Sequence, residues 1–303
     1  MRSLTRAVLT IAAAVAIDAA TATASLVVDG VLDTEYGAAL ATQTTQTSFN
    51  NANASNSSDP VRYADGSELD GFYARVDGDV LHLLLAGNLG FCCATSFSHQ
   101  EVFHLFIDCQ PGGQPTLRAD NPMAGGWSLV DLAGLTFDPG FEPDYWLGCT
   151  VNMASSFAEL LAGGGGQGCD LGSNPVGAPG TLVGGRNPYG ILAAVNNTNG
   201  AGVTMGCAAA SGSGVTTGVE WAIPLAAIGG PRGCFRACVL VADAESAEIG
   251  NQAFGPLPPG TSALGAAEGV NLGSLPGNQH VTICPPGSEA RNETWGQLKT
   301  IYR

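Results

Sequence analysis

The residues best suited to bind a ligand are aromatic and acidic side chains near the middle of the chain. Flat aromatic rings stack on pyranose faces, and nearby carboxylates accept hydrogen bonds from sugar hydroxyls. The candidates of this kind are Trp127, Asp138, Asp144, Tyr145 and Trp146. We therefore expect sugar recognition, where it occurs, to involve this stretch.

Two of these positions also have a structural interpretation. Trp146 fits a core residue at the start of a strand, which is the interpretation we favour, and Asp138-Pro139-Gly140 has the composition of a turn. Trp127 follows Gly125-Gly126, which is typical of a loop. Trp127 is therefore the better candidate for an exposed aromatic platform.

A second set of acidic residues offers the oxygen ligands that calcium requires. Asp29, Asp33 and Glu35 lie near the expected first strand, and Asp243 and Glu245 lie at the end of a late strand. First and late strands often pair in β-sandwiches. These five carboxylates are therefore the candidate site for a structural calcium ion.

Motifs typical of catalysis are missing from the sequence. It contains no Gly-x-Ser-x-Gly elbow, no His-Glu-x-x-His pair and no phosphate-binding loop. Paired carboxylates for glycoside hydrolysis are assembled in three dimensions and leave no spacing signature. We expect a protein without catalytic residues.

The N-terminus has the three-part pattern of a secretory signal peptide. Arg2 and Arg6 precede an apolar run from Ala7 to Ile17, and Ala22-Thr23-Ala24 resembles a cleavage site. The alternative is a retained membrane anchor, but the run is short for spanning a bilayer. We expect a leader over residues 1–24, no stable membrane insertion, and a secreted protein that is extracellular or held at the cell surface.

The cysteines predict disulfides, since an exported chain reaches an oxidising compartment. Nine of them follow the leader: Cys92, Cys93, Cys109, Cys149, Cys169, Cys207, Cys234, Cys238 and Cys284. Their odd number leaves at least one thiol unpaired or paired with another chain, and the sequence does not fix the connectivity. Our preferred bridge joins Cys149 to Cys169, because the glycine run 163–166 is flexible enough to close that loop.

The charge balance bears on partners. The chain has 11 Lys and Arg against 26 Asp and Glu, and its net charge is −15. Nucleic acid is not an expected partner, because phosphate backbones are bound by clustered basic residues. Divalent cations fit better, and the alternative is that the acidity only keeps an exported protein soluble.

The stretch from Gly66 to Asn88 predicts a β-hairpin. Two apolar runs flank Asp77-Gly78, a dipeptide that suits the positive φ angles of a tight turn. The second half is rich in Gly, Pro, Asn and Ser, which favours strands joined by turns. We expect an all-β, antiparallel, jelly-roll-like β-sandwich with long Gly-rich loops.

Helices are expected at two places, and Pro224 to Ile228 could form one helical turn. Residues 155–161 carry Phe157, Leu160 and Leu161 at helical spacing, and the C-terminal tail carries Trp295 on a comparable stripe. The domain layout that follows is a leader over 1–24, a sandwich domain over 25–284, and a tail with a short helix over 285–303.

Four blocks in the right order carry a family resemblance: Val28 to Tyr36, Ser67 to Asn88, Phe103 to Asp108, and Val219 to Leu225. Together they resemble the superfamily of family 9 carbohydrate-binding modules and DOMON-like domains, and more closely some exported bacterial proteins. The resemblance implies a sandwich that commonly holds a structural calcium and binds sugars or, in some DOMON branches, haem.

Haem is not expected, because its axial ligand would have to come from residues with no other sign of that role. These residues are His82, His104, Met123 and Met205. The leading hypothesis is a non-catalytic secreted module that binds carbohydrate or matrix, with a polysaccharide or glycoconjugate as its partner. The alternative is a structural surface protein that assembles with itself.

Overall fold

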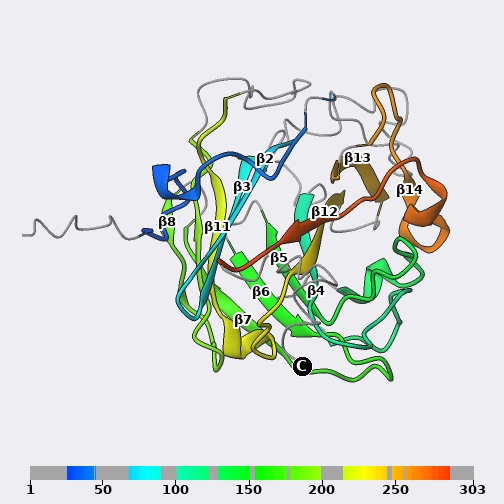
Figure 1. Ribbon diagram of the computed structural model, residues 1–303, viewed down its shortest axis with the longest axis horizontal. Coiled ribbons are helices and arrows are strands. Elements are labelled where there is room, and N and C mark those ends of the chain that lie inside the picture. Colours follow the sequence, from blue (N-terminus) through cyan, green and yellow to red (C-terminus); the bar gives the residue numbers. More distant parts are fainter. Residues whose placement is uncertain are drawn as a thin grey trace, which may run out of the picture.

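Two antiparallel β-sheets lie face to face in the computed structural model (Figure 1). The structure describes residues 26–43, 45, 68–89, 101–122, 129–150, 154–175, 178–198, 214–243, 248–255 and 257–286. It confirms the expected all-β sandwich. The expected leader, the Trp295 tail, Trp127 and Glu245 lie outside the described residues.

The first sheet has six strands in the order β1-β2-β3-β11-β10-β8. They are β1 (Ala41–Thr42), β2 (Glu68–Asp77), β3 (Val80–Asn88), β11 (Gly218–Pro224), β10 (Leu192–Val195) and β8 (Gly180–Thr181). The predicted hairpin is confirmed, because Asp77 pairs with Val80 and Gly78 has a φ of 57°.

The second sheet has nine strands in the order β14-β13-β12-β4-β5-β6-β7-β9, with β15 also paired to β12. They are β14 (Gly265–Ala266), β13 (Glu248–Phe254), β12 (Phe235–Asp243), β4 (Glu101–Asp108), β5 (Tyr145–Thr150), β6 (Ala154–Glu159), β7 (Gly168–Ser173), β9 (Val183–Gly184) and β15 (Val281–Ile283).

Short 3₁₀ turns supply the helical segments of the described chain. They are η1 (Thr34–Tyr36), η2 (Leu129–Leu132), η3 (Leu225–Ile228), η4 (Ala267–Gly269) and η5 (Leu272–Ser274). Among the described residues, no helix is long and apolar enough to cross a membrane.

The helix expected over residues 155–161 is wrong, because this segment forms strand β6. The strand is paired on both sides, with β5 and β7. Phe157 packs into the core between the sheets, whereas Ala158 and Leu160 pack on the opposite side. Apolar residues that serve two separate cores therefore produced the spacing of one helical face.

The central strands β13, β4 and β5 of the nine-stranded sheet are buried on both of their faces. Leu105 of β4 and Leu147 of β5 contribute to the core between the sheets. Phe106, Trp146 and Leu240 contribute to a second core on the outer face, which the loops carrying η2, η4 and η5 cover. This outer layer fixes the loops that follow β4 and precede β5.

A buried carboxylate fastens the first described segment to the six-stranded sheet. Glu220 of β11 is 0% exposed. Its Oε2 accepts hydrogen bonds from the backbone N–H groups of Asp29 and Gly30, both at 2.9 Å, and its Oε1 accepts one from the Tyr36 hydroxyl at 2.8 Å. Burial raises the pKa of Glu220 to about 7, although these hydrogen bonds oppose the rise.

The disulfide expected between Cys149 and Cys169 is wrong, since both residues are free thiols. Cys149 lies on β5 and Cys169 on β7, with β6 between them. Strands that are two positions apart are separated by about 10 Å, beyond the about 7 Å that a disulfide can span between Cα atoms. The bridge in the described structure instead joins Cys234 to Cys284, at the ends of the paired strands β12 and β15.

Replacing Glu220 by alanine is expected to lower the free energy of unfolding by about 3 kcal/mol, because two buried donors and one partly buried donor lose their acceptor. Glu220→Gln keeps one acceptor oxygen and is expected to cost about 1 kcal/mol. Urea denaturation of both variants measures the difference. Equal losses would show that side-chain volume, and not hydrogen bonding, holds the segment.

Removing the Cys234–Cys284 bridge with the double change Cys234→Ser and Cys284→Ser is expected to lower the free energy of unfolding by about 4 kcal/mol. The bridge closes a loop with a sequence separation of 50, which restricts the unfolded chain. Urea denaturation measures the loss, and Cys169→Ser is the control at a free thiol. A double variant as stable as this control would contradict the assignment.

Candidate functional site

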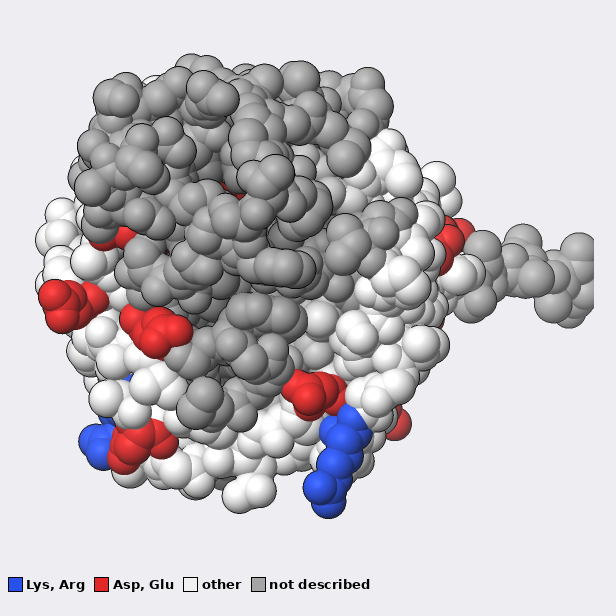
Figure 2. Space-filling view, turned by 180° about the vertical axis from the view of Figure 1, so that it is seen from behind, with Lys and Arg blue, Asp and Glu red and all other residues white. Residues whose placement is uncertain are grey.

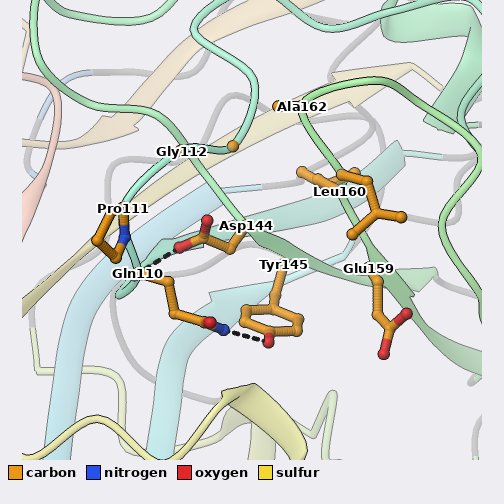
Figure 3. A pocket seen from close by; sticks show the side chains of 10 residues that line it. Gln110, Pro111, Gly112, Asp144, Tyr145, Glu159, Leu160 and Ala162 are labelled. Atoms are coloured by element: carbon orange, nitrogen blue, oxygen red, sulfur yellow. Dashed lines mark hydrogen bonds between the residues drawn. The ribbon is translucent and has the colours of Figure 1, made fainter.

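A polar pocket of about 280 Å³ opens where the nine-stranded sheet meets the loops after β4 and β6 (Figure 3). Its lining comes from three segments: the loop after β4, the start of β5, and the end of β6. The lining residues are Gln110, Pro111, Gly112, Gly113, Asp144, Tyr145, Glu159, Leu160, Leu161 and Ala162.

Asp144 holds the loop after β4 in place. Its Oδ2 accepts hydrogen bonds from the backbone N–H groups of Cys109 and Gln110, both at 2.8 Å. Gly113 has a φ of 97°, and a Cβ on it would lie 2.2 Å from the carbonyl oxygen of Glu142. Only glycine fits this close approach, so the sequence Gly112-Gly113 allows the loop to fold back onto the start of β5.

Tyr145 and Glu159 lie side by side because they are register partners on β5 and β6. The Tyr145 hydroxyl accepts a hydrogen bond from Gln110 Nε2 at 2.5 Å. Oε1 of Glu159 accepts one from the Tyr189 hydroxyl at 3.1 Å. The Tyr145 ring stacks on Phe157 with 5.8 Å between centroids and is 9% exposed, so the pocket presents its hydroxyl and not its face.

The pocket has an acidic character. Burial raises the pKa of Asp144 to about 6, the hydrogen bonds from Cys109 and Gln110 oppose the rise, and the charges of Asp108 and Glu142 add to it. Burial likewise raises the pKa of Tyr145 to about 12, so its hydroxyl stays neutral. At neutral pH the pocket therefore presents the Asp144 carboxylate and a protonated phenol.

Cys109 borders this loop but is not an activated nucleophile. Burial raises the pKa of its thiol, and the nearby charge of Asp144 acts in the same direction. Its Sγ also donates a hydrogen bond to the carbonyl oxygen of Ile228 at 3.2 Å. A thiolate, which is the reactive form, is therefore disfavoured here.

Two of the five residues expected to bind sugar come together in the pocket. Asp144 and Tyr145 line it. Trp146 is 1% exposed in the outer core, where its Nε1 donates a hydrogen bond to His104 Nδ1 at 3.0 Å. Asp138 is buried apart from the pocket, and its Oδ2 accepts a hydrogen bond from the backbone N–H of Gln279 and contacts His280. Trp127 lies outside the described residues.

Sequence reasoning missed Gln110 and Glu159. Glu159 fell within the expected helix, which would have pointed it away from Tyr145. The strand alternation of β6 places Glu159 opposite Tyr145 in register, and an assignment of residues 154–159 as a strand would have indicated this neighbour. Gln110 had no local signal, because its role depends on the backbone hydrogen bonds to Asp144.

Of the carboxylates expected to bind calcium, Asp29 and Asp33 make hydrogen bonds within their own segment. Asp29 Oδ1 accepts a hydrogen bond from the backbone N–H of Val31, and Asp33 Oδ2 accepts one from that of Val27. These are local turn contacts in a segment that rests on β11, whereas Asp243 ends β12 in the other sheet.

The remaining members of the calcium set add no ligand cluster. Glu35 Oε2 accepts a hydrogen bond from the Thr34 hydroxyl, and Glu245 lies outside the described part of the chain. Within that part, no group of three or more His, Cys, Asp or Glu residues is placed to hold a metal ion. Val31 forms an isolated bridge with Thr217, just before β11 in the six-stranded sheet, whereas Asp243 ends β12 in the other sheet.

Acidic side chains are scattered over the described part of the face shown in Figure 2, with few basic ones among them.

Scans against protein-family models, curated proteins and solved structures found no match for the chain. The resemblance to family 9 carbohydrate-binding modules and DOMON-like domains therefore stays an expectation from the sequence.

The raised pKa of Asp144 predicts a pH-dependent stability. The unfolded carboxyl ionises near its ordinary pKa of 3.8, whereas the folded one keeps its proton up to about pH 6. The folded state binds more protons between these values, so the free energy of unfolding is expected to fall as pH rises across this window. Asp144→Asn is expected to flatten the fall in urea denaturation measured over a pH series.

Glu220 contributes a second fall that extends to about pH 7, since its pKa is raised from 4.5 in the same direction. The fall above pH 6 should therefore persist in the Asp144→Asn variant. The variant Glu268→Gln, at an exposed carboxyl outside the pocket, is the control. An unchanged slope in the Asp144 variant between about pH 4 and pH 6 would contradict the assignment.

Proposed function

We propose that this protein is a non-catalytic carbohydrate-binding module. Its pocket at the start of β5 and the end of β6 would hold one sugar unit of a larger glycan. The observation that carries the proposal is that Asp144 and Tyr145 line one polar pocket together with Gln110 and Glu159. Carboxylate, amide and phenol groups that converge in a concave site are the usual partners of sugar hydroxyls.

The size and shape of the pocket favour a small polar ligand. Its volume of about 280 Å³ lies just below the usual range for small-molecule sites, which begins at about 300 Å³. The buried Tyr145 ring leaves recognition to hydrogen bonds at the edge of the sugar, and Leu161, which is 53% exposed at the rim, offers an apolar contact. We expect a terminal or side-chain sugar unit, bound weakly because few groups contact it.

The proposal includes no catalytic step. Oδ2 of Asp144 is occupied by two backbone hydrogen bonds, and the residue is 9% exposed. The leader pattern at residues 1–24 adds the proposal that binding takes place outside the cytoplasm.

A glycan array probed with the folded protein tests the function, run with calcium and with a chelator. We expect saturable binding to one sugar class, and about fivefold weaker binding for Gln110→Ala and for Tyr145→Phe, because each removes a pocket hydrogen bond. Tyr73→Phe is the matched control, because it deletes a phenol oxygen on β2 away from the lining.

Three results would overturn the proposal. Binding that both pocket variants leave intact would place the site elsewhere. Release of reducing sugar from a bound glycan would show an enzyme. A blank array from folded protein, combined with oligomers of this protein that a reductant dissociates, would support the alternative of a self-assembling structural protein.

A further inference from the structure

In each of the two pocket carboxylates, one oxygen accepts hydrogen bonds from backbone N–H or tyrosine O–H groups of the protein. Asp144 uses Oδ2 for the backbone N–H groups of Cys109 and Gln110, and Glu159 uses Oε1 for the Tyr189 hydroxyl. Glu159 Oε2 accepts no hydrogen bond from the described residues, and the further side-chain hydrogen bond to the Asp144 carboxylate comes from the Cys109 thiol, a weak donor. Both carboxylates thus keep acceptor capacity for a ligand.

The other polar side chains of the lining add little donor capacity. Gln110 donates one N–H of Nε2 to the Tyr145 oxygen, and its Oε1 remains an acceptor. Tyr145 then has its own O–H left to donate. Among the lining side chains, acceptors outnumber donors, which suits a ligand rich in N–H and O–H groups.

Positive charge is directed away from the pocket. The lining residues among the described ones include neither lysine nor arginine. Arg236 lies nearby in the sheet, but it pairs with Asp108 and donates to the carbonyl oxygen of Gly140. The charges of Asp108 and Glu142 act on Asp144 from the same side as the loop. An anionic ligand would therefore meet repulsion without a compensating positive charge in the lining.

Figure 3 shows the two carboxylates on either side of Tyr145, with Asp144 next to the Gln110 loop and Glu159 on β6. We infer that the pocket selects a sugar unit bearing a free amine, whose ammonium group binds between or beside these carboxylates while the Tyr145 hydroxyl donates to a sugar oxygen. This inference rests on the proposed function and specifies its ligand class.

A metal ion fits the same atoms less well. Calcium takes six to eight oxygen ligands, whereas this pocket offers two carboxylates and one amide oxygen from side chains. An ammonium group needs about three acceptors in a roughly tetrahedral arrangement. The acceptor set therefore favours the ammonium.

The test compares three tetrasaccharides of equal length by isothermal titration calorimetry near neutral pH: one of glucosamine, one of N-acetylglucosamine and one of galacturonic acid. We expect the glucosamine oligomer to bind about tenfold more tightly than its acetylated counterpart, and the uronic acid oligomer to bind undetectably. The preference should shrink as salt is added, because partly exposed charges are screened.

Glu159→Gln is expected to reduce the tenfold preference to about twofold, since it removes a charge but keeps an oxygen for Tyr189. Glu268→Gln is the matched control, with the same change at an exposed carboxylate outside the lining. Asp144→Asn is a second variant, whose folding the urea series checks independently. A loss of preference in the pocket variants and not in the control supports the inference.

Failure of the inference and failure of the proposed function give different results. Equal binding of the amine and acetylated oligomers, in wild type and variants alike, overturns the amine selection and leaves a neutral sugar site. Binding of none of the three oligomers overturns the inference, and a blank glycan array from folded protein in addition overturns the proposed function. Heat from calcium alone that Glu159→Gln abolishes would overturn the inference in favour of a metal site.

Discussion

The burial of the central strands of the nine-stranded sheet on both faces is the constraint from which the rest of the structure follows. Phe106 and Trp146 point outward from β4 and β5, yet they are buried as fully as the residues between the sheets. The loops between these strands must therefore cover them instead of extending into solvent. That cover brings backbone and polar groups close to the sheet ends, and the pocket forms where the cover stops.

Such a cover works only when buried polar groups find partners inside it. Trp146 donates to His104, and Asp138 accepts from Gln279 while it contacts His280. Asp108 pairs with Arg236 in the same layer. Asp144 and Glu159 differ from these groups because they line the pocket, where Oε2 of Glu159 accepts no hydrogen bond from the described residues.

The sequence predicts the local features better than the contacts between distant segments. The Asp77-Gly78 hairpin follows from turn chemistry and alternation within one short segment, and the structure has it. Residues 155–161 mislead because Phe157 and Leu160 serve different cores, a fact that no single-segment pattern contains. The failed pairing of Cys149 with Cys169 has the same origin, since it needs the order of β5, β6 and β7.

The candidate site was predictable to the same extent. Asp144 and Tyr145 are neighbours in sequence, and their residue types were sufficient to select them. Gln110 joins them only because Asp144 binds the backbone of the loop after β4, and Glu159 only through the register of β5 with β6. Trp146 has an aromatic ring of the kind that stacks on sugars, but this ring is buried in the outer core.

The ionised carboxylate of Asp144 lowers the stability of the folded protein. Burial disfavours the ionised form of Asp144, so the folded protein is less stable with that charge than without it. A ligand with an ammonium group would offset this penalty in the bound state, and it would stabilise the folded protein by mass action. A neutral sugar could offer hydrogen bonds to Asp144 but could not cancel its charge. The electrostatic penalty of the buried Asp144 carboxylate is therefore the physical basis for a preference between ligands of similar shape.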